Sequence, residues 1–260
     1  YAAAKLDTGN APGDNIEFDH RPGWISPRFF DGQTNIASLV LAAGSSVKAP
    51  NGLSVQSSLL RSQLIGIVNG DHSVAFERKP TLFNTQVPAF GIWIVMDFSH
   101  PIGIERMRFY PRNTVFADPD RPFQGDFLRG YEVWVNPRLT DSAGGAPDIL
   151  VARVPENDEP VVELPIKPQY VRLVKLRSIT ETPFEIDEVE VYGTGYLEEG
   201  TYYSDLIDLG GRAVVGPLNW QERSVGDSAF SQVQMQVRTG NDSTPIRLRV
   251  LRWPVDQIRS

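Results

Sequence analysis

A short run of oxygen-bearing side chains, N-G-D-H-S at residues 69–73, is the part of this sequence best suited to hold a metal ion. Asn69, Asp71 and Ser73 alternate along it and can offer an amide, a carboxylate and a hydroxyl oxygen. A hard cation such as Ca²⁺ takes roughly six to eight oxygen ligands of these kinds. The same side chains also close turns by accepting hydrogen bonds from the backbone nearby. A calcium site and a metal-free turn are therefore both open here.

A second candidate is the long segment at residues 111–129, which contains three prolines and no periodic pattern. Loops of this length are uncommon unless they have a function. Arginine and asparagine could donate hydrogen bonds to hydroxyls, and phenylalanine could stack on the apolar face of a sugar. The candidate ligand-binding residues are Arg112, Asn113, Phe116, Arg121 and Phe123. We favour the alternative, in which the phenylalanines pack on the core and the arginines pair with Asp118, Asp120 or Asp126.

No catalytic group of residues is visible. The three histidines lie far apart, without the H-x-x-x-H spacing of a zinc site. There is no Cys, which excludes disulfides and a cysteine nucleophile. The pairs Glu185/Asp187 and Glu188/Glu190 could mimic the two carboxylates of a glycosidase. Solubility of a sheet edge and metal ligation explain them more simply, so we expect no enzymatic activity.

The segments that flank these loops have the patterns of β-strands. Residues 92–98 are apolar on both faces until Asp97 and suit a buried strand. The Ser-His-Pro at 99–101 predicts a turn, and an alternating pattern from Met107 predicts a second strand. A similar pair of strands is expected at residues 170–192. Further strands are expected at residues 36–41, 45–49, 131–135, 149–154 and 161–164. One short helix is expected after Ser57-Ser58, so the predicted fold class is all-β.

Composition narrows the class of protein and of partner. The chain has 260 residues and a formal net charge of −7, without a long block of one sign. Nucleic-acid binding needs a basic surface, so we expect no nucleic-acid partner. No apolar run reaches the ~18 residues that a membrane span needs. Because the first residue is Tyr1, we expect the chain to be processed or part of a longer protein.

Three segments taken together resemble the galactose-binding-like β-sandwich of the discoidin, or coagulation-factor type C, family. The first is N-G-D-H-S-V-A-F at residues 69–76, which is similar to the family's D-G-D-x-S/T-x-x-W loop. The second is residues 91–110, similar to its W-I-x-x-D-L-G-x-x-x-x-I-x-x-I-R-F-Y pattern. The third combines Y-V-R-L at residues 170–173 with F-E-I-D-E-V-E-V-Y-G at residues 184–193. The resemblance implies an antiparallel jelly-roll sandwich.

The resemblance also bears on the metal. Many members of this family hold a structural Ca²⁺ at the first segment, with a Glu from the last strand. The matching residues are Asn69, Asp71, Ser73 and Glu188. Here Asn69 replaces the usual Asp and Phe76 the usual Trp, and the loss of one carboxylate weakens the electrostatic attraction for a cation.

For organisation, the sequence predicts three parts: an extended N-terminal arm at residues 1–35, the galactose-binding-like sandwich at 36–196, and a partial second β-sandwich at 197–260. Strands in the third part are expected at residues 203–209, 214–220, 230–238 and 246–250. This part resembles segments of bacterial secreted or surface proteins. Four strands are few for a closed core.

Two functions follow from these features. Family members commonly bind carbohydrate, lipid headgroups or protein through loops at one end of the sandwich, and are usually extracellular. The resemblance therefore implies a non-catalytic, extracellular or cell-surface module that binds carbohydrate or a surface glycan. The alternative is a structural subunit of a filament, surface layer or adhesin, assembled as a homo-oligomer through the arm and the C-terminal unit.

Overall fold

The structure is a computed structural model, and it describes residues 9–11, 15–18, 22–42, 44–50, 58–80, 87–113, 120, 122–137, 147–197, 200–212, 214, 216–224 and 231–240. The elements up to β8 are β1 (Ile16–Glu17), β2 (Ser26–Pro27), β3 (Phe29–Asp31), η3 (Ala37–Leu41), β4 (Ser46–Lys48), α1 (Ser58–Gly66), β5 (Phe76–Arg78), β6 (Trp93–Tyr110), β7 (Tyr131–Asn136) and β8 (Ile149–Val154). The others are β9 (Val162–Ser178), β10 (Phe184–Ile186), β11 (Glu188–Tyr192) and β12 (Thr194–Tyr196).

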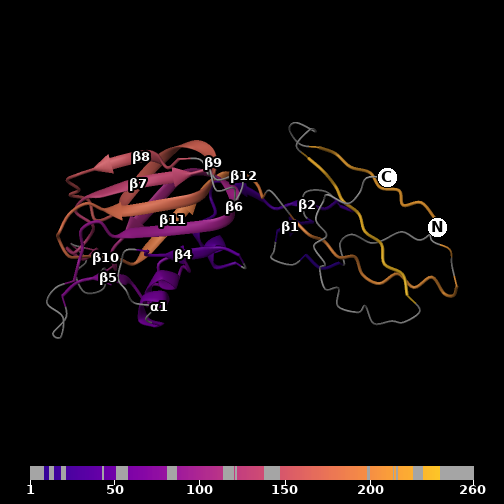
Figure 1. Cartoon of the computed structure of the whole chain (residues 1–260), viewed down its shortest axis with the longest axis horizontal. Helices are drawn as coiled ribbons and strands as arrows, with labels where there is room; N and C mark the ends of the chain where they lie inside the picture. Colours follow the sequence, from indigo (N-terminus) through magenta and orange to yellow (C-terminus); the bar gives the residue numbers. More distant parts are fainter. Residues whose placement is uncertain are drawn as a thin grey trace. The chain divides into compact units, whose positions relative to one another are not determined.

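An antiparallel, six-stranded sheet is the main element of the fold (Figure 1). Its strand order is β11-β6-β9-β7-β8, and β4 pairs with the first part of β6. Short antiparallel pairs join β5 to β10, β3 to β12 and β1 to β2. All described strand pairs are antiparallel, which confirms the predicted all-β, antiparallel class.

Strand β6 is continuous, and the prediction of two strands joined by a turn is wrong. The residues expected to form the turn instead make an irregularity, where the register with β9 shifts between Asp97 and Ile102. At that point Ser99 has a positive φ of 63°, and its backbone N–H donates to Asp97 Oδ1 at 2.9 Å. Pro101 falls within the shifted stretch, where it has no ladder bond to donate, so a proline is tolerated inside the strand.

Strand β9 is likewise one element, although two strands at 161–164 and 170–176 were predicted. Residues 185–192 were predicted as one strand, but in the structure they form two strands, interrupted at Asp187. Strand β10, before the break, pairs with β5, and β11, after it, pairs with β6. At the break the backbone N–H of Asp187 donates to the carbonyl of Tyr110 at 2.8 Å. Asp187 therefore connects the end of β6 to the β5–β10 pair, which we call the second layer.

The predicted helix after Ser57-Ser58 is confirmed as α1, whereas the strand predicted at residues 36–41 is wrong. Residues 37–41 form the 3₁₀ helix η3. The Asn35 side chain explains it, because Oδ1 accepts the N–H of Ala37 at 3.0 Å and that of Val191 at 3.1 Å. An Asn side chain that closes a turn in this way competes with an extended strand.

One core joins the sheet to the second layer. Side chains from one face of β6, including Ile94, Met96 and Phe109, belong to the same buried cluster as Phe76 of β5 and Phe184 of β10. Residues of α1 and η3 complete the cluster. Full burial of side chains of this size is worth about 1.5–3 kcal/mol each. The core therefore fixes the strand ends that carry the site below.

The described residues up to Tyr203 and those from Ser204 onward belong to two separate units. From Ser204 to Gly240 the described residues are assigned to neither helix nor strand, and residues 246–250 lie outside the described residues. The predicted second β-sandwich and the boundaries at residues 35 and 196 stay predictions. No helix among the described residues has the length and apolar character needed to cross a membrane.

Candidate functional site

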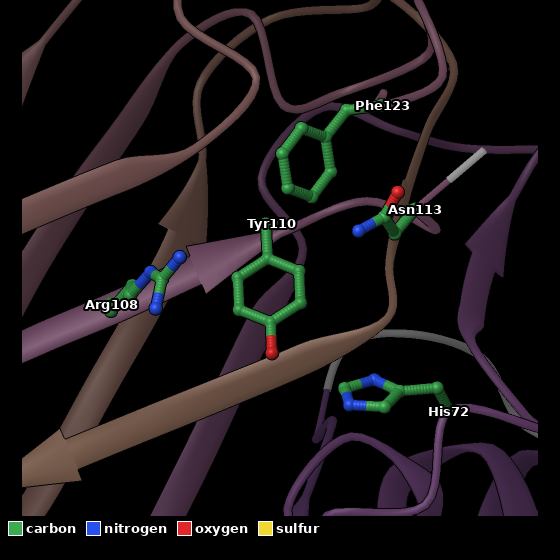
Figure 2. A pocket seen from close by; sticks show the side chains of 5 residues that line it. All are labelled: His72, Arg108, Tyr110, Asn113 and Phe123. Atoms are coloured by element: carbon green, nitrogen blue, oxygen red, sulfur yellow. The ribbon is translucent and has the colours of Figure 1, made fainter. Parts of the chain in front are cut away.

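A small pocket of about 160 Å³ opens where β6 ends. Figure 2 shows Tyr110 in the middle of its lining, with Arg108 to one side and the remaining side chains to the other. Two parts of the chain that are distant in sequence supply it: the end of β6 with the residues that follow, and the 69–73 loop. The lining residues are His72, Arg108, Tyr110, Asn113 and Phe123.

Two aromatic rings form the apolar part of the pocket. The rings of Tyr110 and Phe123 meet edge to face, with centroids 5.8 Å apart and an interplanar angle of 61°. Phe123 is held by a β-bridge to Asn113, and the N–H of Gln124 donates to the carbonyl of Arg112 at 3.2 Å. Residues 112–113 and 123–124 thus lie side by side, with Phe123 against Tyr110.

Glu190 of β11 orders the polar side of the pocket. Its carboxylate accepts hydrogen bonds from the hydroxyls of Tyr110 at 3.1 Å and Tyr192 at 2.9 Å, and lies 3.5 Å from Arg108. Burial, and then the negative charge of Glu190, raise the pKa of Tyr110, so its hydroxyl stays a donor. The guanidinium of Arg108 lies 5.1 Å from the centre of the Tyr110 ring. Within the described part of the chain, its buried Nε has no hydrogen-bond partner.

His72 closes the pocket from the 69–73 loop. Its Nδ1 lies 2.6 Å from Oδ2 of Asp187, at the break between β10 and β11. Burial raises the pKa of the Asp187 carboxyl, and His72 opposes that rise. A neutral His72 that donates from Nδ1 presents Nε2 as an acceptor. The buried carboxylate therefore orients a ring whose centroid is 6.1 Å from that of Tyr110.

Next to the pocket, the 69–73 loop has the hydrogen bonds of an Asx-type turn. The N–H of Asp71 donates to Asn69 Oδ1 at 2.8 Å, and the N–H of Ser73 donates to Asp71 Oδ1 at 3.1 Å. Gly70, with φ of 73°, donates its N–H to Glu188 Oε1 at 3.3 Å. The loop and the strand whose residues match the family's calcium site thus lie together, within the turn that was the metal-free alternative.

Glu188 is the residue of this group that most resembles a cation ligand. Its side chain is buried, its Oε2 has no hydrogen-bond partner in the described chain, and burial raises its pKa to about 7. No group of three or more His, Asp or Glu side chains close enough to hold a metal occurs among the described residues. A cation would therefore depend on Glu188 and Asp71 together with amide, hydroxyl and carbonyl oxygens, a donor set that suits Ca²⁺.

Of the five predicted ligand-binding residues, the structure brings Asn113 and Phe123 into the pocket. Arg112 is engaged elsewhere, 2.6 Å from Glu77 and 3.3 Å from Glu185. It pairs with carboxylates, as the alternative predicted, although not with the three aspartates named there. Phe116 and Arg121 lie outside the described residues.

Sequence reasoning missed His72, Arg108 and Tyr110 as pocket residues. Arg108 was visible as the polar position of an alternating strand, and His72 stood inside the oxygen-rich loop. Neither pattern shows that the 69–73 loop meets the end of β6, because their contact depends on the interruption between strands β10 and β11 at Asp187.

No model of a known protein family matches the chain, and no curated protein matches it. Solved structures of similar fold include chitosan-binding module 1 of a chitosanase/glucanase from Paenibacillus sp. IK-5, with a TM-score of 0.42 and 13% identity over 62% of this chain and 100% of that one. Another is the family 32 carbohydrate-binding module of Clostridium perfringens NanJ in complex with galactose (TM-score 0.39, 13% identity, 56% and 92% coverage).

A third is CpGH89CBM32-5 from Clostridium perfringens, in complex with GalNAc-β-1,3-galactose (TM-score 0.36, 15% identity, 50% and 83% coverage). Each likeness concerns the fold alone. These structures are galactose-binding-like carbohydrate-binding modules, the group that the three sequence segments resemble.

Proposed function

We propose that this chain carries a non-catalytic carbohydrate-binding module whose binding site is the pocket at the end of β6. The observation that supports the proposal is the combination of an aromatic surface, Tyr110 with Phe123, and polar side chains around it. Sugar-binding sites need an apolar surface for a pyranose face and a few fixed polar groups for its hydroxyls. The pocket has both.

Each polar side chain has a definite part in this proposal. Asn113 offers an amide that can donate and accept, Arg108 offers a cationic donor, and His72 offers a ring nitrogen. Glu190 and Asp187 hold Arg108 and His72 in place. A ligand would thus meet groups that are oriented before it binds, which lowers the entropic cost of binding.

The experiment is a binding titration by calorimetry with galactose and chitotriose, preceded by affinity electrophoresis in gels that contain galactan or chitosan. We expect wild-type protein to bind at least one of these probes. Asn113→Ala and Phe123→Ala should each weaken binding about fivefold or more, because loss of a hydrogen bond or a stacking contact costs about 1 kcal/mol or more. The control is Arg106→Met, on β6 but outside the pocket, where the side chain lies 4.0 Å from the Tyr192 ring. If Asn113→Ala and Phe123→Ala bind as tightly as the control Arg106→Met, the pocket is not the binding site.

The proposal includes a structural Ca²⁺ on the 69–73 loop, held by Asp71 and Glu188 with oxygens of Asn69 and Ser73. A bound Ca²⁺ would supply positive charge between the exposed Asp71 carboxylate and the buried Glu188 carboxylate. What supports it is the unpartnered, buried Oε2 of Glu188. Calorimetry with CaCl₂ alone tests it. The expected result is one site in the wild type and none in Glu188→Gln, and the absence of binding to the wild type would reject the metal.

Location and assembly are also proposed. We place the module outside the cell or on its surface, which fractionation of the native source would test. The alternative role, an assembly subunit, is supported by the alternating Q-V-Q-M-Q-V sequence in the C-terminal unit, where Val233, Met235 and Val237 are about half exposed. Light scattering after size exclusion, at several protein concentrations, tests that role. A homo-oligomer that Val233→Asp dissociates would support it, and a monomer at all concentrations would reject it.

A further inference from the structure

The loop that carries two of the pocket residues is tied to one buried carboxylate, Glu185 of β10. The Glu185 side chain is fully buried, with 0% of its surface exposed. Its Oε1 accepts the backbone N–H of Arg112 at 3.0 Å, and its Oε2 accepts the Arg112 guanidinium at 3.3 Å. The residue that begins the loop is therefore held by both its main chain and its side chain.

The far end of the same loop reaches the same carboxylate. The Lys79 ammonium lies 2.5 Å from Glu185 Oε2 and also pairs with Asp126. In addition, the backbone N–H of Glu185 donates to the carbonyl of Asp126 at 2.8 Å. Burial alone would lower the pKa of Lys79, but its bonds to Asp126 and Glu185 raise it, so Lys79 stays charged. Residues 112 and 126 thus converge on one side chain.

The pocket residues lie between these two anchors. Asn113 directly follows Arg112, and Phe123 is bridged to Asn113. Any movement of Arg112 and Asp126, which we call the loop base, would therefore displace both side chains relative to Tyr110. In contrast, Arg108 and Tyr110 lie on β6, which is paired with β11 in the sheet, and His72 lies on the 69–73 loop.

We propose that Glu185 is a positioning residue for the pocket: by holding Arg112 and, through Lys79, Asp126, it fixes the loop that places Asn113 and Phe123 over Tyr110. This inference rests on the proposed function for its binding consequence, although the fixing of the loop can be tested without any ligand. It gives Arg112, predicted from the sequence to contact ligand, a role in the loop base instead.

Lys79 and Arg112 each have a second carboxylate partner, so Glu185→Gln can test the anchor without leaving either cation unpaired. Without the Glu185 charge, Lys79 retains Asp126 and Arg112 retains Glu77 at 2.6 Å. Each of these partly exposed cations thus keeps an anion, and Glu185→Gln keeps the side-chain volume and one acceptor oxygen. We therefore expect the variant to fold while losing the common anchor.

The test combines a ligand-free measurement with a binding measurement. Hydrogen exchange and ¹⁵N–¹H spectra of the wild type, Glu185→Gln and the control Glu163→Gln are compared. Glu163 is a more exposed carboxylate, 3.4 Å from Arg106 and outside the loop. In Glu185→Gln we expect the amide resonance of Arg112 to shift and the amides of Arg112 and Gln124 to exchange at least tenfold faster. The amides of Ile94 and Met96 should stay protected, and Glu163→Gln should match the wild type.

Binding to galactose and chitotriose is then measured on the same proteins. At least a fivefold weaker affinity in Glu185→Gln, with native protection of β6, supports the proposal. Unchanged exchange at Arg112 and Gln124 would overturn it, and so would faster exchange with unchanged affinity. If the wild type binds neither sugar, the proposed function fails, while the exchange data still decide whether Glu185 fixes the loop. If Glu185→Gln does not fold, Lys79→Met provides a second comparison, because it removes the side-chain tie between Glu185 and Asp126 and leaves their backbone hydrogen bond in place.

Discussion

Replacing Glu188 by glutamine should remove a pH-dependent loss of stability that the structure assigns to this side chain. Burial raises the pKa of Glu188 from its ordinary value of 4.5 to about 7. In the unfolded chain the group ionises near its ordinary value, so between these pH values the folded state binds more protons. The free energy of unfolding therefore falls as the pH rises from 4.5 to 7, and the loss is complete above 7.

The size of the effect follows from the two pKa values. At about 1.4 kcal/mol for each pH unit between them, ionised Glu188 costs on the order of 3 kcal/mol in the folded protein. Glutamine has nearly the same shape and can still accept the Gly70 N–H that Glu188 Oε1 accepts at 3.3 Å. In calcium-free buffer, Glu188→Gln should thus match the wild type near pH 4.5 and exceed its stability by up to about 3 kcal/mol at pH 8.

The assay is urea denaturation of both proteins at several pH values, with EDTA and then with CaCl₂. Calcium should stabilise the wild type at pH 8 and leave Glu188→Gln unchanged, because only the wild type has the carboxylate. Parallel pH profiles in EDTA would refute the reasoning, since they would show that Glu188 ionises without cost. Equal stabilisation of both proteins by calcium would refute its assignment as a ligand.

Two further predictions concern stability. Burial would raise the pKa of Asp97, but its bond to Arg172 at 2.8 Å lowers it, so its contribution is present above its ordinary pKa of 3.8 and is lost on acidification. Asp97→Asn should cost roughly 1–3 kcal/mol at pH 7 and flatten the acid limb of the denaturation profile; a wild-type profile would contradict this. A Cβ at Gly193 would lie 1.8 Å from the Gly103 carbonyl oxygen, whereas one at Gly125 would meet nothing within 4 Å. Gly193→Ala should therefore lower the melting temperature far more than Gly125→Ala, and equal melting temperatures would contradict the close approach.

The all-β class could be predicted from the sequence because alternation and apolar runs depend only on neighbouring residues. The same local signals failed at Pro101, where the residues expected to form a turn became an irregularity inside β6. They failed again at Asn35, whose side chain accepts an N–H from Val191, a residue far along the chain. In both places a tertiary contact decided the local structure.

The candidate site was predictable only in part, for a similar reason. The loops could be recognised by composition, and Asn113 and Phe123 do line a pocket. The division of the chain at Asp187 has no local signature, yet it brings the His72 loop to the end of β6. The partner of Arg112 was also out of reach, because Glu185 is 73 residues away.

The most direct test of the account is a ¹⁵N–¹H chemical-shift titration of the wild-type protein with galactose and with chitotriose. The account predicts that the perturbed amides cluster at the end of β6 and around it, at residues 72, 108–113 and 123, with the rest of the sheet unchanged. Perturbations centred on another face of the sheet, or none with either sugar, would contradict the claim that this pocket binds carbohydrate.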